Sequence, residues 1–201
     1  MIPKFLFPFL PYRSFAFPVL VVSAIAVPCW LVFRLYRRRT PGQRVSVQRE
    51  FLLVIFVVYL SALAAVTLIP NHNSPLAARA AMGIDLHPSL ASLTCSSATH
   101  AGGSTAQSFC VRNARGNVML FFPLGILLPL VWTNLRFWKG LQLALALSCS
   151  IELVQYFSSG WSNRSADIND VVLNALGACL GLGLVFLLRL LRASRPTVSP
   201  A

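Results

Sequence analysis

Long apolar runs separated by short polar segments dominate this chain. Five runs combine low polarity with near-membrane length: residues 15–33, 51–69, 117–132, 141–157 and 171–188. A helix needs about 20 apolar residues to cross the hydrocarbon core of a bilayer. In lipid the backbone must satisfy its own hydrogen bonds, so helices are the expected form, and these runs are too long for barrel strands. The pattern predicts an all-α, polytopic membrane helix bundle with about five transmembrane helices.

The charge balance supports this interpretation and predicts an orientation. Only 11% of residues are charged, against about a quarter in a soluble domain. The chain has 17 Lys and Arg but five Asp and Glu, and a nucleic-acid binder would share that excess but not the apolar runs. Arginines concentrate in residues 34–50, between the first two runs. Cytoplasmic loops carry the positive excess, so we expect the amino terminus outside, the carboxyl terminus in the cytoplasm, and no nucleic-acid partner.

The same pattern divides the chain into three parts. Residues 1–44 form an extra amino-terminal helix with the basic cytoplasmic loop, which we expect to be retained rather than cleaved as a signal peptide. Residues 45–192 form a four-helix core that includes an outer loop over residues 71–116. That loop is expected to be a lid or mostly irregular, with one short helix over residues 76–82. Residues 193–201 form a disordered tail.

The cysteines and histidines of the outer loop are candidates for a disulfide and for a metal site. Cys95 and Cys110 share the loop and would pair in an oxidising compartment, but the sequence leaves their separation open. His72, His87 and His100 match no metal-ligand spacing. We therefore expect no metal and no other cofactor.

Polar residues of the fourth run share one helical face. Ser148, Glu152 and Gln155 are spaced four and then three residues apart, so they lie on the same side of a helix. Ionisable groups at membrane depth usually face the bundle interior or a water-filled cavity. Glu152 is therefore a candidate functional residue.

The fifth run carries a matching stripe. Asp170, Asn174, Gly177 and Gly181 recur at helical spacing, and the two glycines permit close approach of a neighbouring helix. Asp167 precedes the run and suits a helix N-cap. The connection between the last two runs is short, so we expect antiparallel neighbours whose polar stripes face each other, with Glu152 and Asp170 side by side.

Two interpretations of this polar region remain open. It forms either a pocket in the outer leaflet or an ion-pair network that only fixes helix packing. Arg164 and the outer Arg112 or Arg115 are natural counter-ions for the acids. Asn117, expected to open the third helix, would add an amide at the same level.

Three segments of the chain resemble the VanZ-like family. They are Asn117–Gly125 (NVMLFFPLG), Ser150–Gln155 (SIELVQ) and Arg164–Gly177 (RSADINDVVLNALG), and the resemblance covers roughly residues 45–190. The family consists of small multi-pass membrane proteins and is named for a glycopeptide-resistance gene cluster, in which a member lowers susceptibility to teicoplanin. The extra amino-terminal helix and the long outer loop with cysteines depart from its pattern. The resemblance implies these ligand-binding candidates: Asn117, Glu152, Gln155, Arg164, Asp167, Asp170 and Asn174.

Three functions agree with these observations. The first is a multi-pass protein of the cell membrane whose outward-facing polar pocket binds an amphiphile and contributes to glycopeptide tolerance. That amphiphile would be a lipid-linked cell-wall precursor or a lipoglycopeptide, with membrane lipids as further partners. The second is an intramembrane enzyme that uses Glu152 and Asp170 in acid–base chemistry on a lipid head group, although no activated nucleophile is evident. The third is a structural partner subunit in the membrane.

Overall fold

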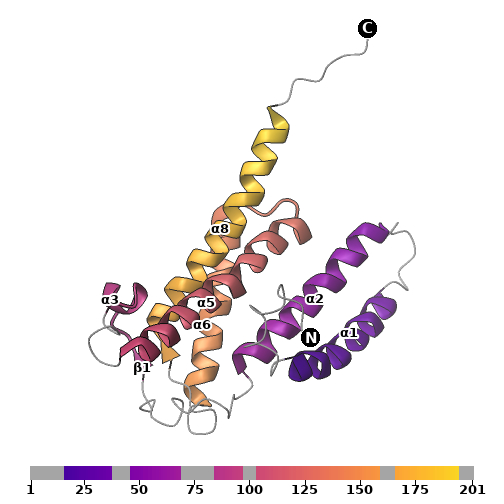
Figure 1. Ribbon diagram of the computed structural model, residues 1–201. Helices are drawn as coiled ribbons and strands as arrows, with labels where there is room; N and C mark the ends of the chain where they lie inside the picture. Colours follow the sequence, from indigo (N-terminus) through magenta and orange to yellow (C-terminus); the bar gives the residue numbers. More distant parts are fainter. Residues whose placement is uncertain (1–15, 38–45, 69–83, 97–102, 159–165, 195–201) are drawn as a thin grey trace, which may run out of the picture. The chain divides into compact units, whose positions relative to one another are not determined.

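The computed structural model describes residues 16–37, 46–68, 84–96, 103–158 and 166–194. In these ranges five helices are long and apolar enough to cross a membrane (Figure 1). They are α1 (Ala16–Arg37), α2 (Val47–Leu68), α5 (Gly103–Val131), α6 (Phe137–Phe157) and α8 (Ile168–Ala193). The predicted all-α, multi-pass fold class is therefore confirmed, while the orientation of the termini stays a prediction.

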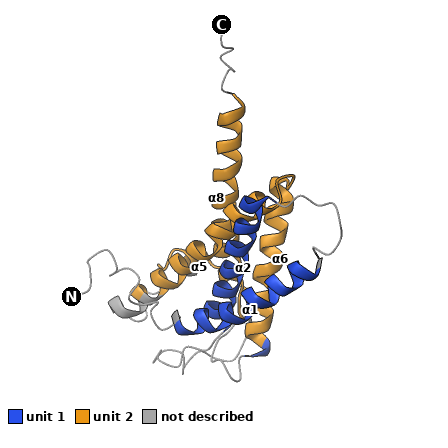
Figure 2. Ribbon diagram, turned by 90° about the vertical axis from the view of Figure 1, so that its right-hand side faces the viewer, with its two compact units in different colours: residues 1–82, 157–164 blue, residues 83–156, 165–201 orange. Residues whose placement is uncertain are grey.

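The chain forms two compact units (Figure 2). Residues 1–82 and 157–164 make the first, and residues 83–156 and 165–201 make the second. The three-part division drawn from the sequence stays a prediction beside this one. The expected helix over residues 76–82, Arg164 and the tail after Ser194 lie outside the described residues.

In the first unit, a charge pair joins α1 to α2. The Arg34 guanidinium, near the end of α1, donates to the carboxylate of Glu50 in the first turn of α2. Arg34 also lies 5.8 Å from the ring centroid of Trp30. A carboxylate near a helix N-terminus is favoured by the helix dipole. Glu50, one of the chain's five acidic residues, thus forms an ion pair with Arg34 within this unit.

In the second unit, α5 and α8 run in the same direction with their backbones in close contact. A Cβ atom added to Gly177 would overlap the carbonyl oxygen of Val118, and one added to Gly181 would overlap that of Phe122. From the other side, a Cβ added to Gly125 would overlap the carbonyl of Ala178. The predicted close approach at the two glycines of α8 is confirmed, and the neighbouring helix is α5.

The third helix of this unit, α6, runs antiparallel to α8. Ser148 contacts Asn174, and farther along a Cβ added to Gly140 would meet the side chain of Leu182. As the residue number rises in α6, that of its contact in α8 falls. The expected antiparallel arrangement of the last two helices is confirmed.

Arg189 links α5 and α8 near their C-terminal ends. Its guanidinium donates to the carbonyl oxygens of Thr133, at 3.2 Å, and Pro129. These carbonyls lie at or beyond the last turn of α5, where the helix offers no backbone partner. The guanidinium also lies 5.5 Å from the ring centroid of Phe186. Arg189 thereby joins the end of α5 to α8.

Part of the predicted outer loop is helical in the structure. The helix α5 begins at Gly103, so the expectation of a mostly irregular loop is wrong for residues 103–116, and Asn117 lies within the helix instead of opening it. The polar side chains of residues 103–116 give no apolar run, so the sequence pattern did not indicate a helix there. A helix still forms, because its backbone hydrogen bonds do not depend on apolar side chains. A short helix, α3 (Leu90–Leu93), and two parallel strands, β1 (Ile84–Asp85) and β2 (Ala166–Asp167), complete this end.

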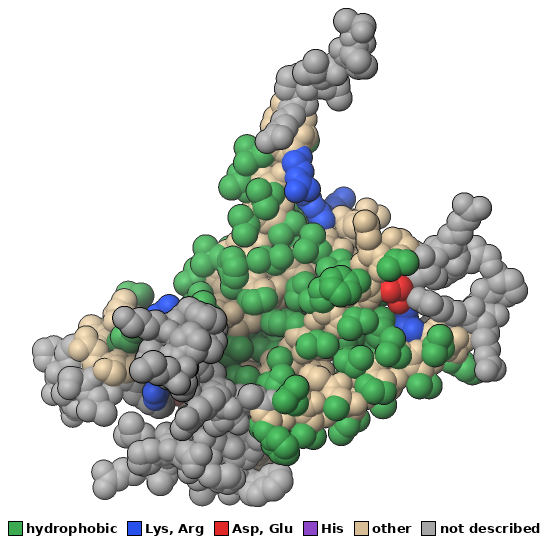
Figure 3. All heavy atoms as spheres, turned by 45° about the vertical axis from the view of Figure 1, so that its right-hand side comes forward, with side chains coloured by type: hydrophobic (Ala, Val, Ile, Leu, Met, Phe, Trp, Pro, Cys, Tyr) green, Lys and Arg blue, Asp and Glu red, His purple; other side chains and the backbone are tan. Residues whose placement is uncertain are grey.

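The surface of the described helices is mainly hydrophobic. Figure 3 shows apolar side chains over most of the visible face, with charged groups confined to small patches. Large exposed side chains include Leu143 and Leu153 of α6 and Leu180 and Leu187 of α8. Such a surface suits contact with lipid tails, and the polar side chains of α6 and α8 described below are turned inward.

Candidate functional site

The polar face of α6 points into the second unit. Ser148, Glu152 and Gln155 are 0%, 8% and 6% exposed, while the neighbouring Leu153 and Val154 are about half exposed. The helical spacing of the three polar residues predicted their common face. A buried carboxylate must find hydrogen-bond donors, because an unpaired buried charge is strongly unfavourable.

One donor for Glu152 comes from the backbone just before α8. The amide nitrogen of Asp167 lies 3.1 Å from Oε2 of Glu152. Asp167 belongs to β2, which is paired in parallel with β1 so that Asp167 is opposite Asp85. The two-residue strand therefore holds in place the segment that presents the amide to Glu152.

The side chain of Asp167 has a separate role as the N-cap of α8. Its Oδ1 accepts hydrogen bonds from the backbone nitrogen and the side-chain nitrogen of Asn169, both at 2.8 Å. The backbone of Asp167 is extended, as an N-cap requires. The predicted N-cap is confirmed, and Asp170 lies in the first turn that follows.

Asn169 is a site residue that the sequence analysis missed. It is 4% exposed, and its Oδ1 accepts a hydrogen bond of 3.0 Å from the backbone nitrogen of Ser89. Its amide thus joins the cap of α8 to the segment leading into α3. Asn169 lies off the helical stripe that contains Asp170 and Asn174, so helical spacing did not single it out. The Asp-x-Asn spacing at a helix start was an available signal for a local side-chain to backbone turn.

Asn174 contacts α6 from the next turn of α8. Its Nδ2 donates to Oγ of Ser148 at 3.0 Å, and it is 4% exposed. Its Oδ1 is buried and has no hydrogen-bond partner within the described residues. A buried acceptor in this state costs about 1–3 kcal/mol.

A complementary donor lies on α5. The side-chain nitrogen of Asn117 is also buried without a hydrogen-bond partner in the part of the chain that the structure describes. The contacts of Asn113 with Asp170 and of Val118 with Gly177 fix the parallel register of α5 and α8. That register places Asn117 and Asn174 at the same level of the bundle, one offering a donor and the other an acceptor.

The two carboxylates singled out from the sequence have different described partners. Asp170 is half-buried, and its Oδ1 accepts a hydrogen bond of 3.1 Å from the side-chain nitrogen of Asn113 on α5, whereas Glu152 contacts Asp167. The polar stripe of α8 therefore contacts two helices, α6 through Asn174 and α5 through Asp170. A helix stripe is wide enough to meet two neighbours when both pack closely. The side-by-side placement of Glu152 and Asp170 stays a prediction.

The structure brings most of the candidate residues to one end of the second unit. We use the name polar cluster for six buried or partly buried residues: Asn117, Ser148, Glu152, Asp167, Asn169 and Asn174. Gln155 shares the inward face of Glu152, and Asp170 lies at the edge of the cluster, while Arg164 is outside the described residues. The cluster contains two carboxylates, three amides and one hydroxyl, a set suited to binding hydroxyl and amide groups. No group of three His, Cys, Asp or Glu side chains in the described ranges is placed to hold a metal ion.

Membrane-length helices with an inward polar cluster define a multi-pass α-helical membrane protein. The chain belongs to the VanZ/LLP1 family, whose sequence profile matches residues 56–189. It is 36% identical over 69 residues to Protein VanZ of Enterococcus faecium, a match that spans 34% of this chain and 40% of that protein. No solved structure matches the chain significantly.

Proposed function

We propose that this protein binds the polar head of an amphiphile at the polar cluster and thereby contributes to glycopeptide tolerance in the cell envelope. Family membership supports a link to teicoplanin resistance. Glu152, Gln155 and Asn174 point into the protein instead of toward lipid. Polar and ionisable side chains that point inward from membrane segments are typical of binding sites, which supports a binding role.

The observation that carries this proposal is the pair of unsatisfied amide groups. Asn117 presents a buried donor and Asn174 a buried acceptor, neither with a partner among the described residues. A ligand hydroxyl or amide can accept from one and donate to the other. Binding would then recover the cost of about 1–3 kcal/mol that each buried, unpaired group carries. The nearby Glu152 carboxylate would add a charge-assisted hydrogen bond.

The chemistry of the cluster favours an amphiphile as the ligand. The surrounding helices are apolar, so a lipid tail would remain in hydrocarbon while a head group with hydroxyls and amides enters the cluster. A lipid-linked cell-wall precursor and a lipoglycopeptide both have this design. Arg164 would meet a phosphate or carboxylate of such a ligand. Tolerance would follow if the protein shields the target of the drug or competes for the drug itself.

This proposal places the polar cluster on the outer side of the cell membrane. The disulfide between Cys95 and Cys110 lies at the same end of the second unit as the start of α8, and disulfides persist in oxidising, extracytoplasmic surroundings. The arginines of residues 34–50 support a cytoplasmic position for the loop after α1. Thiol labelling of intact cells after reduction would test this orientation.

Substitutions in the cluster test the proposed function. Cells would express Glu152→Gln or Asn174→Ala at the level of the unaltered protein, and the exposed Asn134→Ala would serve as a matched control. We expect both cluster variants to lose teicoplanin tolerance and to bind teicoplanin or a lipid-linked precursor more weakly in detergent. The loss of affinity should be about tenfold for Glu152→Gln, because a hydrogen bond to a charged group contributes roughly 1.5 kcal/mol or more, and about fivefold for Asn174→Ala, because a neutral hydrogen bond contributes roughly 1 kcal/mol.

Two results would contradict the binding proposal. Variants that remain folded and keep both tolerance and binding would show that the cluster is only structural. Tolerance lost by Glu152→Gln with ligand affinity unchanged would indicate turnover instead of binding. Thermal unfolding of each purified variant would establish that loss of function is not loss of fold.

A further inference from the structure

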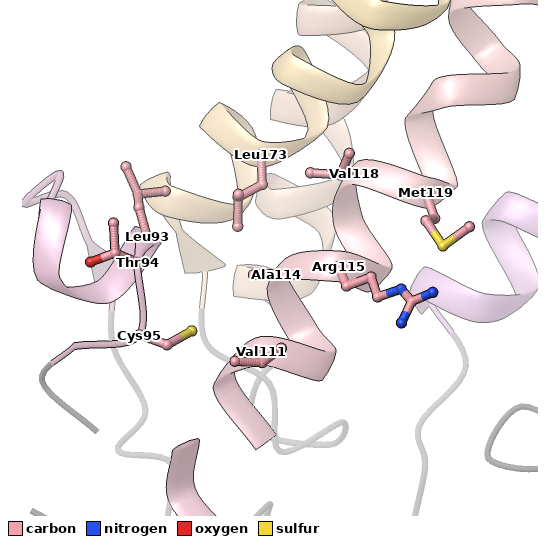
Figure 4. A pocket seen from close by; sticks show the side chains of 9 residues that line it. All are labelled: Leu93, Thr94, Cys95, Val111, Ala114, Arg115, Val118, Met119 and Leu173. Carbon is pink, nitrogen blue, oxygen red and sulfur yellow. The ribbon is translucent and has the colours of Figure 1, made fainter. Parts of the chain in front are cut away.

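A second feature of this unit is an apolar groove on a different face from the polar cluster. It has a volume of about 340 Å³ and lies between the α3 segment, α5 and the first turns of α8 (Figure 4). Leu93, Val111, Val118 and Leu173 form its apolar walls, and Arg115 lies at its edge. We use the name α3 groove for this feature.

The close packing of α5 and α8 separates the α3 groove from the polar cluster. Val118 and Leu173 line the groove, while the preceding Asn117 and following Asn174 carry buried polar atoms. Successive residues of a helix point about 100° apart. The two features therefore use different faces of the same helix pair, and a ligand in one does not need the other.

Arg115 is the charged group of the α3 groove. It is exposed and makes no hydrogen bond or ion pair with any residue that the structure describes. The membrane-length part of α5 begins at Cys110, so Arg115 lies roughly 7 Å along the helix from that point. At this depth a long cationic side chain can bury its stem and extend its charge to the level of lipid head groups.

The walls of the groove are held by a covalent link. Cys95, which follows α3, forms a disulfide with Cys110 of α5 across a sequence separation of 15 residues. The sequence left this pairing open, and the structure shows it. Cys95 lines the groove and adopts a left-handed backbone with φ of 58°. A wall fixed in this way reduces the ordering cost of filling the groove.

We propose that the α3 groove holds an acyl chain of an anionic phospholipid, with the lipid phosphate at Arg115. The groove is apolar, borders the membrane-spanning part of α5 and has a cation without a described partner at its edge. A phosphate group complements that charge, and its acyl chain complements the apolar walls. A zwitterionic lipid would fit the walls but would bring its own cation close to Arg115.

Native mass spectrometry of the purified, delipidated chain tests this site. The probes are dioleoyl phosphatidylglycerol and dioleoyl phosphatidylcholine, added in equal amounts. The unaltered protein should retain the anionic lipid in preference to the zwitterionic one. Arg115→Gln should weaken retention of phosphatidylglycerol about fivefold, the effect of roughly 1 kcal/mol per basic residue near anionic lipid. Arg112→Gln removes the same charge from a residue of α5 outside the groove and should change retention little.

A second variant tests the apolar walls separately from the charge. Ala114→Phe would fill the groove and reduce retention of both lipids, while Ala146→Phe on the exposed side of α6 would not. Equal retention of the two lipids by the unaltered protein, or equal effects of Arg115→Gln and Arg112→Gln, would overturn the proposal. Glu152→Gln should keep the lipid preference, so this site and the proposed function can fail independently.

Discussion

The carboxylate of Glu152 accepts a hydrogen bond of 3.1 Å from the backbone amide of Asp167. This contact joins α6 to the start of α8, and it leaves the Asp167 side chain free to cap α8 through Asn169. The two acids therefore do not compete for one donor. Each binds an N–H group that burial would otherwise leave unsatisfied, which explains why acids are placed where their desolvation is costly.

Replacement of Asn169 should destabilise the second unit. Asn169→Ala removes one hydrogen bond to Asp167 and one from Ser89 in a buried position. We expect a loss of about 1–3 kcal/mol in unfolding free energy. Asn113→Ala removes an exposed amide contact with Asp170 and should cost less than about 1 kcal/mol. Thermal unfolding in mild detergent would measure both, and an equal loss would contradict the central position assigned to Asn169.

The glycines of α8 should differ sharply in their tolerance of a methyl group. Gly181→Ala would force its Cβ onto the backbone of α5, whereas the Cβ of Gly183→Ala meets no atom within 4 Å. Overpacking costs about 1–3 kcal/mol or more when backbone must move. We expect Gly181→Ala to unfold at lower temperature and Gly183→Ala to be neutral or slightly stabilising. Comparable melting of the two variants would show that α5 and α8 are not in backbone contact.

Loss of the disulfide should destabilise the N-terminal part of α5. Cys110→Ser opens a link between residues separated by 15 positions, and a loop of that length contributes about 3 kcal/mol in the chain-entropy description. The exposed, unpaired Cys149 provides the control, and Cys149→Ser should leave the unfolding temperature unchanged. Reduction should reproduce the effect in the unaltered protein. A protein unaffected by both treatments would contradict the stabilising role.

Arg189 should be more important for stability than Arg192 in the same helix. Arg189→Gln removes guanidinium donors from the carbonyls of Thr133 and Pro129, which lie at or past the end of α5. Hydrogen bonds to charged groups contribute about 1.5–3 kcal/mol, and partial exposure reduces this to roughly 1 kcal/mol. Arg192→Gln, on an exposed residue, should change unfolding by less than half of that. A larger loss of unfolding free energy for Arg192→Gln than for Arg189→Gln would contradict a stabilising role for the contact of Arg189 with α5.

Local patterns predicted the membrane spans and the cap of α8. The span of α2 follows from an apolar run, since length and apolarity alone decide whether a helix suits a bilayer. The N-cap role of Asp167 follows from residue type next to a helix start. The same reasoning failed for residues 103–116, because their polar side chains concealed a helix that continues into the apolar run.

The sequence by itself determined that this protein is a bundle of membrane-length helices with inward polar faces. Helix length and side-chain periodicity are properties of neighbouring residues. Only the tertiary structure decided that α8 meets α5 through its glycines and α6 through Asn174, that Asn169 joins the cap to Ser89, and that Cys95 pairs with Cys110. These contacts join residues distant along the chain, and their distances depend on how whole helices pack, which no local spacing records.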